Sequence, residues 1–180
     1  MAVLYGRGNN GYRVLIHGYL GMTRQKKSFT ARGGIWVLAQ VPLMLLAFII
    51  PVRYGTGQFV PDHMLPFVGA TVVALGVVLI VWGFISLGDA LTPFPQPLDE
   101  VALRRQGAYR LMRHPIYTGV ILASLGWTLW WLCAIGVLPV LVLAIFFDRK
   151  AAHEENWLRE KYKDYGDYAR RVKKFIPGVY

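Results

Sequence analysis

Two short clusters of ionisable side chains are the residues of this sequence best suited to chemistry. The first, Arg113-His114, directly precedes Pro115, and proline favours the first turn of a helix. The free amides and the positive dipole end of a helix N-terminus attract an anion such as a carboxylate. This cluster therefore predicts an anion-binding helix start. The alternative is an Arg-His pair that only anchors a helix at a membrane surface.

The second cluster contains Lys150, His153, Glu154 and Glu155. Lys150 and Glu154 are four positions apart, so on a helix they share one face. An ordinary surface ion pair is the alternative interpretation, and such pairs contribute little to stability. The choice depends on whether the fold brings the two clusters together.

Three long uncharged blocks must position these clusters. No Asp, Glu, Lys or Arg occurs between Gly33 and Val52, between His63 and Gly88, or between His114 and Phe147. About 20 apolar residues cross a bilayer. The chain is 55% hydrophobic and 17% charged, which is more apolar and less charged than a typical soluble domain. We therefore expect membrane-spanning helices rather than the buried core helices of a soluble protein.

The blocks predict four spans. Trp36–Pro51 is the first and Leu65–Leu87 the second. As one helix, the 34 uncharged residues of the third block would reach roughly 51 Å, well beyond a hydrocarbon core of about 30 Å. We expect them to fold as a hairpin that turns near Trp131–Gly136. The predicted fold class is an all-α polytopic membrane bundle of about four transmembrane helices, with this C-terminal hairpin and a cytosolic C-terminal helix over Asp148–Val172.

The basic residues predict the orientation. Nineteen of the twenty Lys and Arg residues fall on the side shared by both termini and the connection 89–113. By the positive-inside rule this side is cytosolic. We expect an integral protein of a bacterial inner membrane, with both termini in the cytosol. The net charge of +10 then reflects orientation and anionic headgroups, and we expect no nucleic-acid partner.

The 180 residues predict a single membrane domain. Within it we distinguish a basic cytosolic arm (1–34), the first two spans (35–88) and a catalytic core (89–180). The arm does not have the pattern of a cleaved signal peptide. The lone Cys133 excludes an internal disulfide and a cysteine metal cluster, and we expect no metal site. The oligomeric state is left open.

The hairpin decides between the functional and the surface interpretations of the two clusters. Its two ends emerge on one side of the membrane, so Arg113-His114 and Lys150–Glu155 must be neighbours there. Ionisable groups that converge at membrane depth indicate a functional site.

In these motifs the sequence resembles the isoprenylcysteine carboxyl methyltransferase family, which is grouped with the membrane phospholipid methyltransferases, and it looks like the bacterial members. The resemblance covers roughly residues 86–178, about half of the chain. The matching residues are Gly107-Ala108-Tyr109, the run from Arg113 to Gly119, Glu154-Glu155, Leu158, Tyr165, Tyr168 and Pro177.

The resemblance implies S-adenosyl-L-methionine as the methyl donor, S-adenosyl-L-homocysteine as its product and a lipophilic methyl acceptor from the bilayer. It implies cofactor contacts by the strip Val101 to Arg104, by Tyr109, by the run His114 to Tyr117 and by Glu154. Physically, Arg113 and His114 suit the carboxylate of the cofactor, and Glu154 suits a cationic group. The expected cofactor-binding residues are Val101, Leu103, Arg104, Tyr109, Arg113, His114, Pro115, Tyr117 and Glu154.

The resemblance also implies that Lys150 faces the acceptor, at a position where the eukaryotic enzymes have arginine. Because lysine lacks the planar fork that pairs with a carboxylate, the acceptor can be a carboxylate, a thiol or an amine. Only an amine needs a base, for which Glu155 or His153 is the candidate, so Lys150 and Glu155 are the expected catalytic residues. The alternatives are a phospholipid or amine N-methyltransferase, an NADPH-dependent membrane reductase of the sterol type, and a non-enzymatic membrane subunit.

Overall fold

The computed structural model describes residues 28–30, 33–56, 64–92, 94 and 101–180. Most of the predicted basic arm (1–34) lies outside the described residues. The described part is helical: the elements are α2 (Gly34–Tyr54), α3 (Leu65–Leu87), α4 (Pro115–Trp130), α5 (Val137–Lys161) and the short α6 (Tyr165–Arg171). Three single 3₁₀ turns, Gly88–Ala90, Gly107–Arg110 and Ala134–Gly136, lie between them. Within the described ranges the chain forms no β-strand, only one isolated bridge between Met112 and Lys173.

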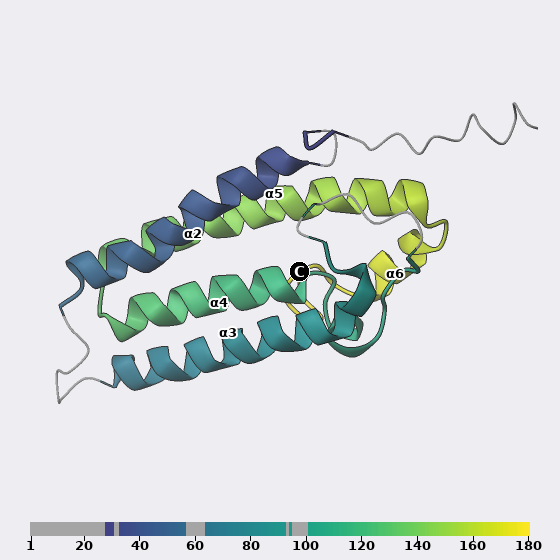
Figure 1. Cartoon of the computed structure of the whole chain (residues 1–180). Helices are drawn as coiled ribbons and strands as arrows, with labels where there is room; N and C mark the ends of the chain where they lie inside the picture. Colours follow the sequence, from purple (N-terminus) through teal and green to yellow (C-terminus); the bar gives the residue numbers. More distant parts are fainter. Residues whose placement is uncertain (1–27, 31–32, 57–63, 93, 95–100) are drawn as a thin grey trace, which may run out of the picture.

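The four long helices run side by side, with α4 between α3 and the pair α2 and α5 (Figure 1). The second predicted span coincides with α3, and the first lies within α2. The third uncharged block is divided as predicted: α4 ends at Trp130, and α5 begins after the 3₁₀ turn that ends at Gly136. Leu132 has a positive φ of 51° at this reversal.

The predicted C-terminal helix over Asp148–Val172 is wrong in its bounds. The residues after the apolar part of α5, which ends at Phe147, continue the same helix to Lys161. The helix stops at Tyr162, whose backbone becomes extended, and α6 begins at Tyr165. The break has a packing reason, because it lets Tyr165 turn inward, where it is 1% exposed.

Helices α3 and α4 pack at backbone distance. Glycines at seven-residue intervals on α3 face α4, and a Cβ on Gly76 would lie 2.6 Å from the backbone nitrogen of Ala123 and 2.7 Å from the carbonyl oxygen of Gly119. Gly69 meets Gly126 in the same way. Small residues allow membrane helices this close approach. The α3–α4 seam, defined by these glycines and Gly83, is therefore closed along its length.

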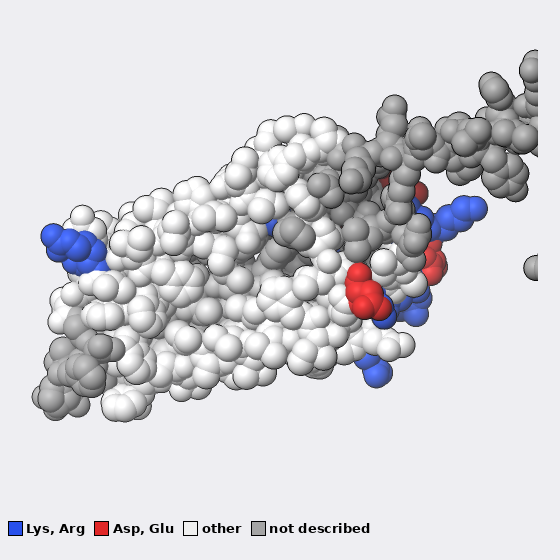
Figure 2. Space-filling model, in the orientation of Figure 1, with Lys and Arg blue, Asp and Glu red and all other residues white. Residues whose placement is uncertain are grey.

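The face of the bundle seen in Figure 2 is apolar between two ends that carry charged side chains. Large hydrophobic side chains on α3 face outward, with Phe67 76% and Ile85 73% exposed. Two helices, Gly34–Tyr54 and Leu65–Ala90, are long and apolar enough to cross a membrane. An apolar belt of this size favours lipid contact over water.

Candidate functional site

The segment before α4 is held by the C-terminal residues. The Arg113 amide donates to the Lys173 carbonyl at 2.9 Å, and the His114 amide donates to the Lys174 carbonyl at 3.1 Å. Helix α4 begins at Pro115 as predicted, but His114 makes no side-chain cap. The backbone amides of Arg113 and His114 thus donate to carbonyls of the C-terminal segment and are not free to bind a ligand.

Arg113 is held mainly by protein groups. Its Nε donates to Glu155 Oε1 at 2.8 Å and its Nη2 to Glu155 Oε2 at 3.2 Å. Its Nη1 donates to the carbonyls of Ala169 and Val172, at 2.9 and 2.5 Å. A two-pronged pair with further carbonyl bonds is among the stronger polar arrangements in proteins. Arg113 therefore ties the start of α4 to α5 and to the end of α6, and these bonds use four of the five N–H donors of its guanidinium.

Glu155 is the other half of this clamp. Its side chain is 7% exposed, and Oε1 also lies 3.0 Å from His114 Nε2. Burial alone would raise the pKa of Glu155, but the hydrogen bonds from His114 and Arg113 outweigh it and lower the pKa to about 2. A carboxylate with so low a pKa is a poor proton acceptor. We call Arg113, His114 and Glu155 the clamp.

Glu154 points the other way, toward Tyr117. The Tyr117 hydroxyl donates to Glu154 Oε2 at 2.9 Å, and His114 Nδ1 lies 3.9 Å from the same oxygen. The Tyr117 ring is stacked between His114 and Phe147, at centroid distances of 5.4 and 4.7 Å. Adjacent glutamates on α5 therefore have different surroundings, one fixed in the clamp and one beside a stacked tyrosine.

Lys150 lies one helical turn before Glu154 and is 3% exposed. Its ammonium donates to Gln40 Oε1 of α2 and lies 5.1 Å from the centre of the Tyr117 ring. The sequence analysis assigned no functional residue to the first span, so it missed Gln40. The available signal was a lone amide side chain within an otherwise apolar stretch.

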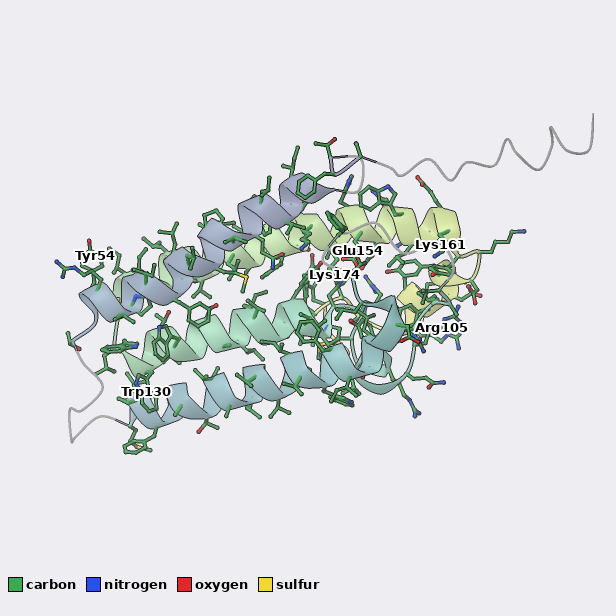
Figure 3. All side chains as sticks on the ribbon, viewed as in Figure 1. Tyr54, Arg105, Trp130, Glu154, Lys161 and Lys174 are labelled. Carbon is green, nitrogen blue, oxygen red and sulfur yellow. The ribbon has the colours of Figure 1, made fainter. Side chains whose placement is uncertain are left out.

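These side chains open into one cavity of about 400 Å³ at the end of the bundle where α6 lies. Figure 3 places Glu154 near this end, together with Arg105 and Lys174, whereas Tyr54 and Trp130 mark the opposite end. Of the expected site residues, the wall contains Val101, Leu103, Arg104, Tyr109, Arg113, His114, Tyr117, Lys150 and Glu154. Pro115 and Glu155 do not line the cavity.

Two tyrosine hydroxyls hold the backbone of the cavity wall, one at Tyr109 and one at Val101, the first residue of the strip Val101 to Arg104. The Tyr168 hydroxyl donates to the Tyr109 carbonyl at 2.6 Å, and the Tyr162 hydroxyl donates to the Val101 carbonyl. Burial raises the pKa of Tyr168 to about 12, so its hydroxyl stays protonated. The sequence analysis placed Tyr168 in the motif, but it gave no role to Tyr162.

Among the cationic side chains of the cavity wall, Arg104 is the most exposed. Its side chain is 42% exposed, and the one ion pair that it makes with the described residues is a long contact of 3.9 Å to Asp89. In the same part of the chain, no group of three or more His, Cys, Asp or Glu residues is arranged to hold a metal ion. The cavity thus offers the Glu154 carboxylate, the cations Lys150 and Arg104 and aromatic surface, in addition to Arg113 of the clamp.

Comparison with known proteins identifies the family of the chain. The family model described as phospholipid methyltransferase matches residues 64–165, more than half of the chain. The chain belongs to this family. It is 33% identical over 118 residues to a probable protein-S-isoprenylcysteine O-methyltransferase of Oryza sativa subsp. indica, covering 63% of this chain and 61% of the rice protein.

A second plant relative is similar to the same degree. Protein-S-isoprenylcysteine O-methyltransferase B of Arabidopsis thaliana is 30% identical over 115 residues, 62% of this chain and 58% of that protein. The chain spans about three fifths of the length of these curated relatives. Membership of a membrane methyltransferase family agrees with the apolar belt and implies a methyl donor.

Proposed function

We propose that the chain is an S-adenosylmethionine-dependent membrane methyltransferase that methylates the carboxylate of a lipophilic acceptor of the isoprenylcysteine type. One observation carries the proposal: Glu154 and Lys150 face a single cavity from adjacent turns of α5, beside the stacked Tyr117. The cavity therefore presents a negative group and a positive group to two different ligands.

The donor set of the cavity suits S-adenosylmethionine. Glu154 would hold its ammonium or sulfonium, and Tyr109 offers aromatic surface for the adenine or for the cation. The Tyr117 ring is already stacked between His114 and Phe147, so it would contribute through its hydrogen bond to Glu154. We assign its carboxylate to Arg104 rather than to Arg113, because the clamp uses the Arg113 donors. Val101 and Leu103 supply apolar wall beside Arg104.

When bound, the cofactor supplies an electrophilic methyl: an acceptor carboxylate oxygen forms the new C–O bond, the S–CH₃ bond breaks, and its electron pair stays on sulfur in S-adenosylhomocysteine. Such a displacement moves no proton, so the residues contribute alignment and exclusion of water. Lys150 would orient the acceptor carboxylate, and Glu154 would fix the cofactor one turn away.

The position of the candidate bases favours a carboxylate over an amine. An amine acceptor must lose a proton, and Glu155 is held in the clamp outside the cavity wall. His153 also lies outside the wall, with its ring 5.8 Å from Trp36 and 4.5 Å from Trp157. A carboxylate needs neither group, which agrees with the names of the plant relatives, both of which are O-methyltransferases.

We propose four membrane crossings, with α4 and the apolar part of α5 added to α2 and α3. The charged end that holds the cavity would face the cytosol of a bacterial inner membrane, and both termini would lie there. The chain would form one domain, with the arm 1–34, the spans 35–88 and the catalytic core 89–180. The side-by-side packing of α4 and α5 with the two long apolar helices α2 and α3, and the return of α5 to the end where α4 begins, support this topology (Figure 1).

The test is methyl transfer in reconstituted membranes. The purified protein is incubated with methyl-labelled S-adenosylmethionine and either N-acetyl-S-farnesylcysteine or phosphatidylethanolamine. We expect label on the first acceptor that mild base releases as methanol, the behaviour of a methyl ester. Base-stable label on the second acceptor would instead identify an amine N-methyltransferase, which the family description favours as second candidate.

The same preparation separates the remaining alternatives. A sterol-type reductase would be stabilised against heat by NADPH and not by S-adenosylmethionine. A non-enzymatic subunit would be stabilised by neither. We expect stabilisation by S-adenosylmethionine, with its loss in Glu154→Gln.

A further inference from the structure

Lys150 is a buried cation whose hydrogen-bonding partner is neutral. Within the described residues it forms no ion pair shorter than 4.0 Å, and its ammonium is held by the Gln40 carbonyl oxygen and the face of Tyr117. Taking an ammonium out of water is costly unless a negative charge compensates it. A buried ionisable group at membrane depth is therefore a candidate for ligand binding.

Gln40 fixes where this cation points. Its Oε1 accepts from Lys150, and its Nε2 donates to Met44 Sδ at 3.4 Å on the next turn of α2. The thioether is a weak acceptor, but it sets the orientation of the amide. A flexible lysine stem is thus anchored at its tip by a residue from a different helix.

The location separates this pair from the cofactor groups. Four residues of α-helix advance about 6 Å, so Lys150 lies about that far from Glu154 along α5, on the side of the apolar stretch. The same cavity is lined by Val37 and Gln40 of α2, by Phe84 of α3 and by Ile116 of α4. Residues of all four long helices thus line the cavity into which Lys150 opens, and apart from Gln40 those from α2, α3 and α4 named here are apolar.

We propose that Gln40 is a specificity-determining positioning residue: it holds the Lys150 ammonium so that the cavity selects an acceptor with an anionic headgroup. The inference rests on the proposed function and deepens it. It assigns a role to α2, which lies outside the family match at residues 64–165. A neutral amide suits this role because it orients the ammonium without cancelling its charge.

Replacement by a carboxylate is the sharpest test. Gln40→Glu keeps the size and places a negative charge against Lys150, which satisfies the ammonium internally. We expect binding of N-acetyl-S-farnesylcysteine to weaken by roughly 100-fold, while binding of its carboxamide analogue stays within about twofold. Binding of S-adenosylmethionine, followed by calorimetry, should not change.

Gln40→Leu removes the anchor without adding charge. We expect the KM for the acid to rise by roughly tenfold with kcat within about twofold, because hydrogen bonds to charged groups are worth a factor of this order. Gln40→Asn keeps the amide but shortens the reach, and should recover part of the loss. Val41→Ala is the matched control, one position further on α2 and 54% exposed, and should behave as wild type.

Failure of this inference and failure of the proposed function give different results. Wild-type protein that neither binds S-adenosylmethionine nor transfers methyl overturns the proposed function. Wild-type protein that binds the cofactor but does not prefer the acid to the amide overturns the inference alone. Unchanged discrimination in Gln40→Glu and Gln40→Leu also overturns it, as does a fall in cofactor binding equal to that in acid binding, which would indicate a structural role.

Discussion

The two sides of α4 pack differently against their neighbours. Toward α3 the glycines of the α3–α4 seam bring the backbones into contact, and nothing fits between them. Toward α2 and α5 large side chains hold the helices apart at one end, and a cavity of about 400 Å³ remains. The same short helix thus has a closed face that sets its position and an open face that carries the ionisable groups.

The largest effect is expected from a substitution in the clamp. Arg113→Met leaves Glu155 as a buried charge with His114 as its nearest partner, and breaking a buried pair costs about 3–5 kcal/mol. We expect a marked loss of thermal stability in detergent. Arg110→Met is the control, since Arg110 is exposed three residues earlier. Equal stability of the two variants would contradict the clamp.

Acid should weaken the same clamp. Because the pKa of Glu155 is lowered in the folded protein to about 2, from a usual value near 4.5, its ionised form stabilises the fold. This contribution is complete above about pH 4.5 and is lost as the pH falls toward 2. Unfolding should be followed between pH 6 and pH 3, within roughly this range. Glu155→Gln should be less stable at pH 6 and should show a flatter dependence; a parallel curve would contradict the assignment.

Glu154→Gln tests the open face. The variant keeps an acceptor for the Tyr117 hydroxyl but removes the charge that faces the cavity. We expect affinity for S-adenosylmethionine to fall by roughly 10–100-fold, the usual value of hydrogen bonds to charged groups. Stability without ligand should change little. If cofactor affinity is retained, Glu154 is not the cofactor anion.

Gly76→Val tests the closed face. Its Cβ would meet backbone atoms of Ala123 and Gly119, which cannot move aside as a flexible side chain can. Overpacking of this kind costs about 1–3 kcal/mol. Ala74→Val, at an exposed position on the same helix, is the control. Reduced cofactor affinity in Gly76→Val, beyond the loss of stability, would show that the seam also positions the cavity.

Tyr168→Phe should have the smallest effect. It removes the hydroxyl that donates to the Tyr109 carbonyl and leaves the buried ring in place. A single hydrogen bond of this kind is worth about 1 kcal/mol. Stability should therefore fall slightly, and cofactor affinity by a few-fold at most. A loss as large as that in Glu154→Gln would assign Tyr168 a direct ligand contact.

The convergence of the two clusters was predictable because it depends only on the length of the third uncharged block and on its reversal. The bounds of α3 were predictable for the same reason, since an apolar run ends where charge begins. The partners of individual side chains were not. Spacing places Arg113 next to His114, but whether it binds Glu155 or a ligand depends on carbonyls of Ala169 and Val172, which arrive from another element.

Gln40 was missed for a related reason. An amide in an apolar span signals an interhelical contact, but it does not identify the helix that supplies the partner. The extent of α5 was missed because polarity changes at Asp148 while the helix does not. The sequence analysis took the change from apolar to charged residues for the start of a new helix. Local composition cannot distinguish a helix that continues out of the membrane from a helix that begins at its surface.

The backbone bonds from Arg113 and His114 to the carbonyls of Lys173 and Lys174 also set an order of events during synthesis. All the apolar stretches are synthesised before these two carbonyls. The helices can therefore enter the bilayer and the α3–α4 seam can close while the cavity still lacks one of its supports. Membrane insertion thus precedes completion of the cavity. A chain that stopped before Lys173 would be inserted in the membrane without a complete site.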